Sequence, residues 1–271
     1  MALDKNKVTI FTDVMNTKLQ NKSIALAVAR GEYRGDIVQG GTVKILGSED
    51  VVIGQYTGTI THQTMQGTDQ DVAISNKPYF SIKLGYDDLS QVPKNELAHL
   101  MKEASKALAM DIDDKLVQLV TKAKVSVSGT LADVTGAFTG LATAFDLANV
   151  DEGDRGVILS PIVANSLIGE LGVKLNSEKA ADMAYQGSIG EYMGIEIFKS
   201  NVVTKNGTIE NCIGIDMSAI VLAKSYEDVG QVEGVDFFGS ALRGLMVYGI
   251  DVIETEVGLS DRIIAFGIDA A

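Results

Sequence analysis

The longest uninterrupted helical pattern in the sequence runs from Asn95 to Lys122. Apolar residues recur there in steps of three and four, and neither proline nor glycine interrupts them. At 1.5 Å per residue, the predicted helix is roughly 40 Å long. Pro93 lies just ahead of it, where a proline is tolerated. This helix is the longest element that the sequence predicts.

The segment 31–78 is unusual because it is rich in Gly, Thr, Gln and Asp and has few large apolar residues. Thr42–Leu46 alternates as a half-buried strand does, and Val51–Gly58 fits a returning strand. The predicted turn of this β-hairpin consists of Gly47, Ser48, Glu49 and Asp50. A segment of this length without its own core is typical of a lid, or of an arm that docks on something else.

The rest of the chain mixes predicted strands and helices. Strict alternation predicts strand structure between Val72 and Leu84. Further on, we predict helices at 136–149 and 161–171, strands at 155–161 and 191–201, and two short strands around Gly214. Two long β-type runs, 242–257 and 262–269, predict a hairpin that finishes a sheet.

Composition limits the classes of protein. A chain of 271 residues with 46% hydrophobic residues has enough apolar material for a core, and its length favours a single fold with elaborations. The net charge of −13 argues against a protein that grips nucleic acid through Lys and Arg. The single cysteine, Cys212, cannot form an internal disulfide, and the first 22 residues contain no apolar signal region. We therefore expect a soluble protein with a cytosolic origin and no membrane span.

Asp87 and Asp88 are adjacent carboxylates, which raises the hypothesis of an acid/base pair. They follow an alternating strand, and successive side chains on a strand point to opposite faces. The favoured interpretation is that they mark the end of the strand and place negative charge near the positive end of the next helix dipole. A carboxylate-dependent hydrolase centred on this pair is the alternative from another class.

Other reactive side chains do not form a catalytic constellation in the sequence. Asp111, Asp113 and Asp114 do not share one helix face, so we expect a solvated or partner-facing surface there. His62 and His99 have no ligand at metal spacing, and Cys212 fits a small buried hydrophobe. We therefore predict no catalytic residue, no cofactor and no metal.

The ordered series of these parts resembles the major capsid proteins of tailed bacteriophages with the Hong Kong 97-type fold. "GTVKILGSEDVVIGQYTGT" is similar to the extended loop of that family, and "KPYFSIKLGYDDLSQV" to the strand that leads into its spine helix. "RGVILSPIVANSLIGE" resembles the strand and helix of the axial domain, and "LRGLMVYGIDVI" the closing strands of the peripheral domain. The resemblance extends from about Thr12 to Ala265.

This resemblance implies an α+β fold with a particular division of the chain. Its parts are an N-terminal arm at 1–30, an extended loop at 31–78, a peripheral domain at 79–135 and 235–271 with the spine helix 95–122, and an axial domain at 136–234. In an assembly, the hairpin arm would lie across a neighbouring subunit. Candidates for charge contacts between subunits are Arg30, Arg34, Asp87 and Asp88.

The implied function is structural rather than enzymatic. The protein would assemble with itself, through hexamers and pentamers, into an icosahedral phage head shell that encloses double-stranded DNA without binding it specifically. Scaffolding, portal and decoration proteins are implied partners, and no membrane is involved. Such a protein assembles in the host cytoplasm and ends in the virion. An encapsulin-like bacterial compartment shares the fold and is the closer alternative.

Overall fold

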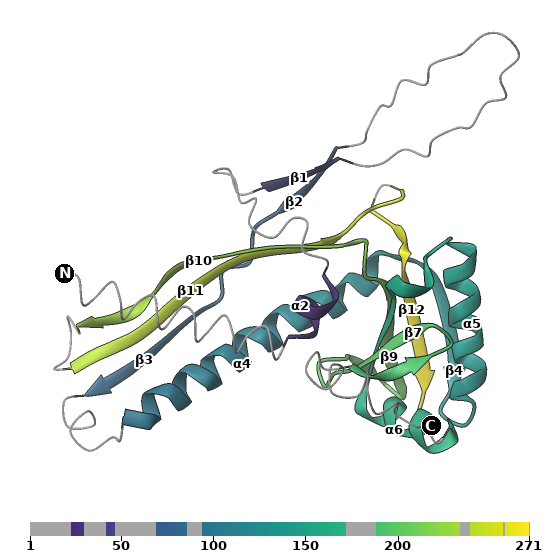
Figure 1. Cartoon of the computed structure of the whole chain (residues 1–271), viewed down its shortest axis with the longest axis horizontal. Helices are drawn as coiled ribbons and strands as arrows, with labels where there is room; N and C mark the ends of the chain where they lie inside the picture. Colours follow the sequence, from purple (N-terminus) through teal and green to yellow (C-terminus); the bar gives the residue numbers. More distant parts are fainter. Residues whose placement is uncertain are drawn as a thin grey trace, which may run out of the picture.

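The computed structural model describes residues 23–29, 42–46, 69–85, 94–171, 188–233, 239–256 and 258–270. The described strands form sheets of two, three and seven strands. Figure 1 shows an elongated part, built on a long helix and the three-stranded sheet, that joins a compact part. Helices and strands contribute to both parts, which confirms the α+β class. Among the described helices we find none that combines the length and hydrophobicity needed to cross a membrane.

The predicted long helix is present as α4, Lys94–Gln118, and it continues as the 3-10 turn η2, Leu119–Lys122. Side chains three and four residues apart line one face of a helix, and this face of α4 is buried. Its buried residues include Met101, Leu108, Ile112 and Leu116. The helix forms because its sequence contains no breaker, and it is held in place by this apolar face.

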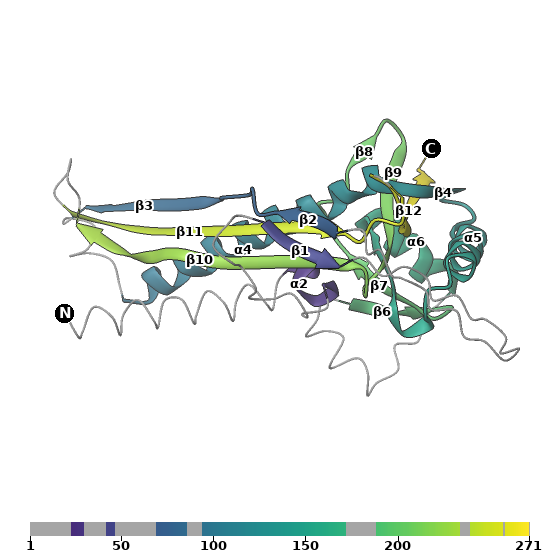
Figure 2. The ribbon, with the colours of Figure 1, turned by 90° about the horizontal axis from the view of Figure 1, so that it is seen from above.

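The three-stranded sheet lies alongside α4, as Figures 1 and 2 show from two directions. Its order is β10 (Ile220–Glu233), β11 (Gly239–Val252) and β3 (Tyr79–Gly85), and all neighbours are antiparallel. The core between this sheet and α4 also takes in the short helix α2, Ile24–Val28. From β11 it contains Leu242, Met246, Tyr248 and Val252.

The seven-stranded sheet forms the compact part and has the order β4, β12, β9, β5, β7, β6, with β8 beside β9. These strands are β4 (Ala123–Thr130), β5 (Arg155–Leu159), β6 (Ser188–Tyr192), β7 (Ile195–Lys199), β8 (Lys205–Asn206), β9 (Ile209–Asp216) and β12 (Ser260–Asp269). β4 runs parallel to β12, and β5 runs parallel to β7. The sheet is therefore mixed.

Two helices pack against one face of this sheet, α5 (Val134–Leu147) and α6 (Pro161–Leu171). Their predicted positions are confirmed. Phe138 and Phe145 of α5 are fully buried in this second core. The opposite face contributes Ile213, Ile215 and Ile263 to the core around α4. The 3-10 turn η3, Glu152–Asp154, leads into β5.

Three strand predictions differ from the structure in bounds or in pairing. The predicted strand 191–201 contains the end of β6 and the whole of β7, because the chain turns between them at Met193 and Gly194, which both have positive φ. The two strands predicted around Gly214 are present as β9 and the start of β10, but Gly214 lies inside β9, and β10 has 14 residues rather than being short. β11 and β12 do not form a hairpin, because β11 pairs with β10 and β3, whereas β12 pairs with β4 and β9.

Strand pairing connects the expected ranges to one another. β4 and β12 belong to the seven-stranded sheet, although they fall in the expected peripheral ranges 79–135 and 235–271. β10 pairs with β11 in the long sheet, although it falls in the expected axial range 136–234. The β-strand pairings of both sheets therefore link residues on either side of the boundaries that the resemblance implies.

Candidate functional site

The residues that the sequence singled out for assembly lie outside the described residues. They are Arg30, Arg34, Gly47, Ser48, Glu49, Asp50, Asp87 and Asp88. The expected N-terminal arm at 1–30 is described only from Ser23 to Ala29. The structure does describe the two points at which these segments join the folded chain, and these points form the candidate site.

The first point is the pair of strands β1 (Thr42–Leu46) and β2 (Asp69–Ala73), which we call the arm foot. The strands are antiparallel, with Val43 opposite Val72. Val51–Gly58, the strand predicted to pair with β1, lies outside the described residues, and the described partner of β1 is β2. The chain between the two strands, residues 47–68, therefore leaves from the arm foot and returns to it.

The arm foot packs on β10 and β11 of its own chain. Val43 of β1 and Ile74, the residue that follows β2, form a small buried cluster with Ala223 and Val247. Val72 is buried against Val221. Among the described residues of segment 31–78, Val43, Val72 and Ile74 are therefore buried against the long sheet.

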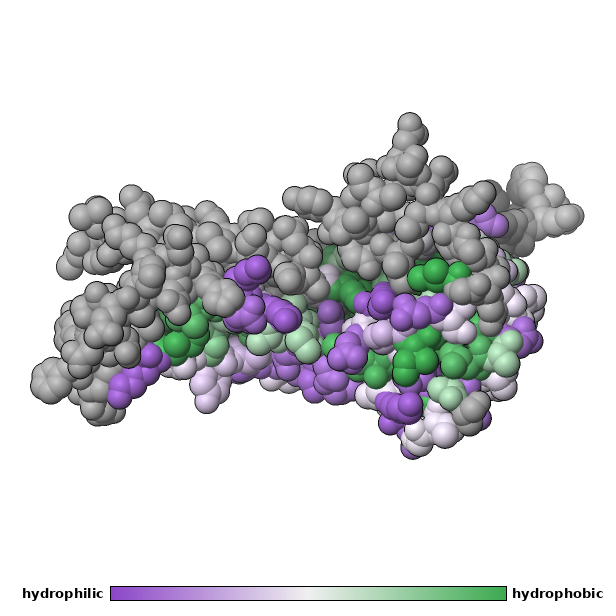
Figure 3. Space-filling view, turned by 90° about the horizontal axis from the view of Figure 1, so that it is seen from below, coloured by the Kyte–Doolittle hydropathy of each residue, from purple (hydrophilic) through white to green (hydrophobic). Residues whose placement is uncertain are grey.

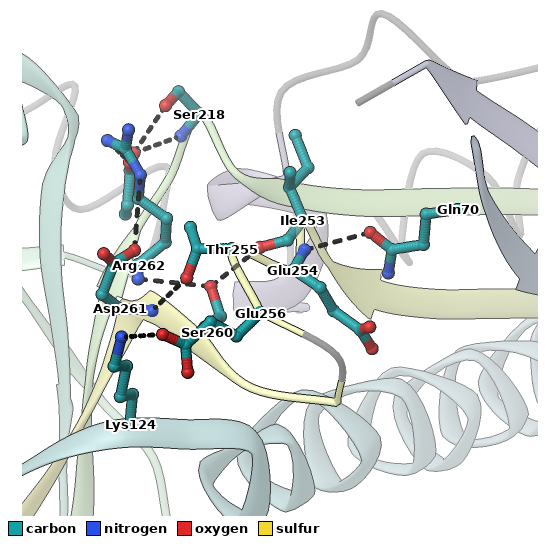
Figure 4. A network of polar contacts seen from close by, with 11 residues as sticks. Gln70, Lys124, Ser218, Ile253, Glu254, Thr255, Glu256, Ser260, Asp261 and Arg262 are labelled. Carbon is teal, nitrogen blue, oxygen red and sulfur yellow. Dashed lines mark hydrogen bonds and ion pairs between the residues drawn. The ribbon is translucent and has the colours of Figure 1, made fainter. Parts of the chain in front are cut away.

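Gln70 adds a directional contact to this apolar packing. Its side-chain Nε2 donates to the carbonyl oxygen of Val252 at 2.9 Å, and its Oε1 accepts from the backbone N–H of Glu254 at 3.0 Å. Figure 4 shows the Gln70 side chain reaching the backbone of Glu254. The arm foot is thus hydrogen-bonded to the chain at the end of β11.

The same stretch of chain is held from another side by Lys122, at the end of η2. The Lys122 Nζ lies 2.7 Å from Asp251 Oδ1 and 2.9 Å from Glu254 Oε1. Burial lowers the pKa of Lys122, but the bonds and charges of these two carboxylates together hold that pKa above its ordinary value. The bond from Lys122 lowers the pKa of Glu254. Lys122 and the arm foot therefore both bind the stretch 251–254, and Glu254 is bound by both.

A network of polar contacts fixes the connection between the two larger sheets, as Figure 4 shows. Ser260 Oγ donates to the carbonyl of Ile253 at 2.8 Å, and the N–H of Asp261 donates to Thr255 Oγ1 at 3.2 Å. Lys124 of β4 pairs with Glu256 at 2.6 Å. These bonds hold the chain in place where it passes from β11 in the long sheet to β12 in the compact part.

The second point of attachment is the start of α2, which is held by Asp113 of α4. The Asp113 carboxylate accepts from Ser23 Oγ at 2.8 Å and from the backbone N–H of Ala25 at 2.9 Å and of Ile24 at 3.3 Å. Ser23 in turn caps α2 by accepting from the N–H of Leu26. This position joins the described N-terminal residues to α4.

The expectation of a solvated or partner-facing surface at Asp111, Asp113 and Asp114 was therefore wrong for Asp113, which is 6% exposed. Burial raises its pKa, although its three hydrogen bonds act in the opposite direction. Asp111 accepts a hydrogen bond from Tyr248 Oη at 2.7 Å, and Asp114 accepts one from Gln118. Only tertiary contacts distinguish these three similar carboxylates.

The remaining reactive residues singled out in the sequence are described only in part. Cys212 is fully buried, as expected, and burial raises the pKa of its thiol to about 12. His62 and the side chain of His99 lie outside what the structure describes. In the described part of the chain, no three His, Cys, Asp or Glu side chains lie close enough to hold a metal ion.

Several large apolar side chains are exposed on the compact part. Leu147 at the end of α5 is 80% exposed, and Ile162 of α6 and Met193 of the β6–β7 turn are almost half exposed. Figure 3 shows apolar patches on the surface of this part. Apolar surface that a single chain leaves open is compatible with contacts between copies.

Comparisons with known proteins bear on the fold. No protein-family model and no curated protein sequence matches the chain. Among solved structures, a chain of Mycobacterium phage Che8 is similar, with 21% identity, a TM-score of 0.69, and 90% of this chain and 91% of that chain covered. The capsid of Ralstonia phage GP4 matches at 12% identity and a TM-score of 0.64, with 90% and 87% covered.

A third similar structure is a virus-like particle from Pyrococcus furiosus. It has 13% identity and a TM-score of 0.57, and it covers 98% of this chain and 100% of that chain. These likenesses extend over most of the chain in each case. The protein therefore has the Hong Kong 97-type fold found in the capsid proteins of tailed phages, as the sequence resemblance implied.

Proposed function

We propose that the protein is the structural subunit of the icosahedral head shell of a tailed bacteriophage. It has no enzymatic role in this proposal, and its main partner is a further copy of itself, arranged in hexamers and pentamers. It becomes part of the virion after assembly in the host cytoplasm. The observation that supports this most strongly is the shared fold over 90% of the chain with phage structures that include a capsid.

The arm foot supports the proposed contact with a neighbouring subunit. Residues 47–68 leave from a narrow two-stranded base, and their length lets the hairpin lie across a neighbouring subunit. We propose that its tip, at Gly47, Ser48, Glu49 and Asp50, contacts that neighbour. Arg30 and Arg34 are proposed to meet Asp87 and Asp88 of another copy, because opposite charges favour one orientation at an interface.

The proposed domains are those that the fold family implies. The ranges 79–135 and 235–271 form a peripheral domain around the spine helix, and 136–234 forms an axial domain near the symmetry axes. The acidic charge of −13 is consistent with a shell that encloses DNA without gripping it. Scaffolding, portal and decoration proteins are further proposed partners, and no cofactor or membrane is required.

The proposal is tested by expressing the full chain, alone and together with a scaffolding protein from the same genome, and imaging the products by electron microscopy. We expect closed shells of uniform diameter. A chain that stays monomeric in both cases, at concentrations at which phage shell proteins assemble, would contradict the proposal. Sedimentation of the same samples gives the assembled fraction.

A bacterial compartment is the second candidate, and the match to the virus-like particle of Pyrococcus furiosus supports it. Its TM-score of 0.57 is lower than the 0.69 for the Mycobacterium phage Che8 chain, so we prefer the phage head. Neighbouring genes separate the two. Portal, protease and terminase genes favour the phage head, whereas an adjacent enzyme gene favours a compartment that encloses it.

The hydrolase alternative has less support. Asp87 and Asp88 lie outside the described residues, so their geometry carries no argument for it. The alternative requires that the double variant Asp87→Asn, Asp88→Asn lose an activity that the parent protein has. Normal assembly of this variant, with no loss of activity on a panel of ester, phosphoester and glycoside substrates, would end it.

A further inference from the structure

We propose that Gln70 is a positioning residue that fixes the arm foot to β11 and so sets the direction in which residues 47–68 leave the subunit. This inference rests on the proposed function, because an arm needs a set direction only when it has a neighbour to reach. It concerns a residue that the sequence pattern did not single out. The argument depends on how the chain from β2 to β3 lies along β11.

β11 is in contact with this chain over its whole length. β3 pairs with Gly239–Leu245, and Asn76 then exchanges two backbone hydrogen bonds with Tyr248, at 3.0 and 3.2 Å. At Gly249 the chain crosses over β11, and a Cβ placed on this glycine would lie 2.7 Å from the carbonyl oxygen of Ala73. The arm foot thus begins at a close crossing of two backbones.

Beyond this crossing, the contacts that the structure describes between arm-foot side chains and the long sheet are apolar except at Gln70. Val43, Val72 and Ile74 pack on β10 and β11, and hydrophobic contact is non-directional. A ribbon held only by its crossing point and by such packing is free to turn about that point. A second attachment farther along the ribbon is needed to fix its direction.

Gln70 provides this attachment with a geometry that imitates a strand. Its amide bonds the carbonyl of Val252 and the N–H of Glu254, two residues further on. A neighbouring parallel strand uses the same two groups, one carbonyl and one N–H on either side of a residue. One side chain therefore extends the pairing of β11 past the crossing, and its two bonds allow only one orientation.

The backbone that Gln70 grips is itself held. Lys122 binds the side chains of Asp251 and Glu254, and Ser260 binds the carbonyl of Ile253. Hydrogen bonds to a backbone that is itself held fix the position of Gln70, whereas hydrogen bonds to a loose loop would not. The direction of the arm foot is therefore set against the end of the spine helix within one subunit, before any neighbour is met.

The test compares two variants of the full chain by hydrogen exchange. Gln70→Met keeps an unbranched side chain of similar length but removes both hydrogen bonds. Asp71→Asn is the matched control, since Asp71 is exposed on the opposite face of the same strand. We expect Gln70→Met to raise amide exchange across 42–46 and 69–73 about tenfold, because two hydrogen bonds are lost. We expect Asp71→Asn to leave this exchange unchanged.

Exchange across these strands that stays at the wild-type rate in Gln70→Met would overturn the proposal. If Gln70→Met does not fold, Gln70→Glu is measured instead, since it keeps the acceptor for Glu254 and loses the donor to Val252. Glu at this position is expected to raise the same exchange, and an unchanged rate would count equally against the proposal.

Particle imaging of the same variants tests the effect on direction. Gln70→Met is expected to form severalfold fewer closed shells than Asp71→Asn at equal subunit stability. Normal shells from Gln70→Met would overturn the role in setting direction. If the wild-type protein formed no shells at all, the proposed function would fail, while the exchange measurement would still decide whether Gln70 holds the arm foot.

Discussion

Single side chains with similar sequence surroundings have different tasks in this protein. Asp113 is buried and holds the first turn of α2, while Asp114, one residue later, bonds Gln118 on the exposed surface of the same helix. Gln70 bonds a backbone that lies more than 180 residues away in the chain. At this scale, function depends on which side chain a distant segment meets.

We predict that Asp113→Ala destabilises the protein by about 2 to 3 kcal/mol, because Ser23 Oγ and two backbone N–H groups lose their acceptor. Asp113→Asn keeps one acceptor and avoids a buried charge, so its cost is expected to be smaller. Urea unfolding of both variants, with Asp114→Asn as a control on the exposed side, measures the difference. Equal losses for Asp113→Ala and Asp114→Asn would contradict the prediction.

The pH dependence of the Asp113 variants has a defined sign. Burial raises the pKa of Asp113 in the folded protein above 3.8, so the folded state binds the proton more tightly than the unfolded state. The wild-type protein therefore gains stability relative to Asp113→Asn as the pH falls through the pKa that Asp113 has in the folded protein. The gain is complete below pH 3.8, the pKa of Asp113 in the unfolded chain. Unfolding curves of both proteins between neutral and acid pH show whether the difference moves in this direction.

Gly249 gives a steric prediction at the same scale. In Gly249→Ala the new methyl group would meet the Ala73 carbonyl at 2.7 Å, and backbone cannot give way as a flexible side chain can. We expect a loss of about 1 to 3 kcal/mol, together with faster hydrogen exchange in β2. Gly153→Ala is the control, because no atom lies within 4 Å of its added Cβ. A similar effect of both substitutions would show that the crossing is not tight.

At the scale of elements, the long helix, the long sheet and the arm foot meet at residues 251–254. η2 contributes Lys122, β2 contributes Gln70, and the start of β12 contributes Ser260. η2, β2 and β12 are far apart from one another in the sequence. This meeting point explains why a strand base with few apolar residues has a defined position in a single subunit.

We expect Lys122→Met to cost about 1 kcal/mol at neutral pH, since the lost pair is only partly buried. The pKa of Glu254 is lowered from 4.5, so the contribution of the pair is present above pH 4.5 and is lost as the pH falls through the lowered pKa. The pKa of Lys122 is raised from 10.5, so the contribution is also present below pH 10.5 and is lost as the pH rises through the raised pKa. Thermal unfolding across this range, with Lys115→Met as control, measures the effect. A cost that does not depend on pH would exclude an ionic origin.

At the scale of the whole molecule, an elongated part and a compact part share one core, because α4 packs against both the long sheet and one face of the seven-stranded sheet. The arm foot and the start of α2 lie on this common body. In the proposed shell, the segments that reach other copies start from these two fixed points. The free energy of assembly comes from the contacts with those copies.

We predict that Asp87→Lys lowers the yield of shells severalfold without changing the unfolding of the subunit, because its proposed contact is made between copies. Reversing the proposed partner in the same chain, as Arg34→Glu, should restore part of that yield. Sedimentation at low and high salt measures both, and the difference should shrink as salt screens the charges. A double variant that assembles worse than either single variant would contradict this pairing.

Local patterns in the sequence were sufficient for a good part of the fold. The period of three and four residues located α4, and the unbroken apolar run with its proline located β5 and α6. The alternation within segment 31–78 correctly indicated the strand Thr42–Leu46. These features depend on neighbours a few residues apart, and backbone geometry makes such neighbours visible as periodicity.

Only the tertiary structure decided which elements meet. The run at 242–257 and the run at 262–269 looked like two halves of a hairpin, yet β12 was drawn into the seven-stranded sheet between β4 and β9. Asp113 and Gln70 gave no local signal, because their partners lie about 90 and 180 residues away. Strand partners and buried polar contacts are selected by the free energy of the complete core, which no short window of sequence contains.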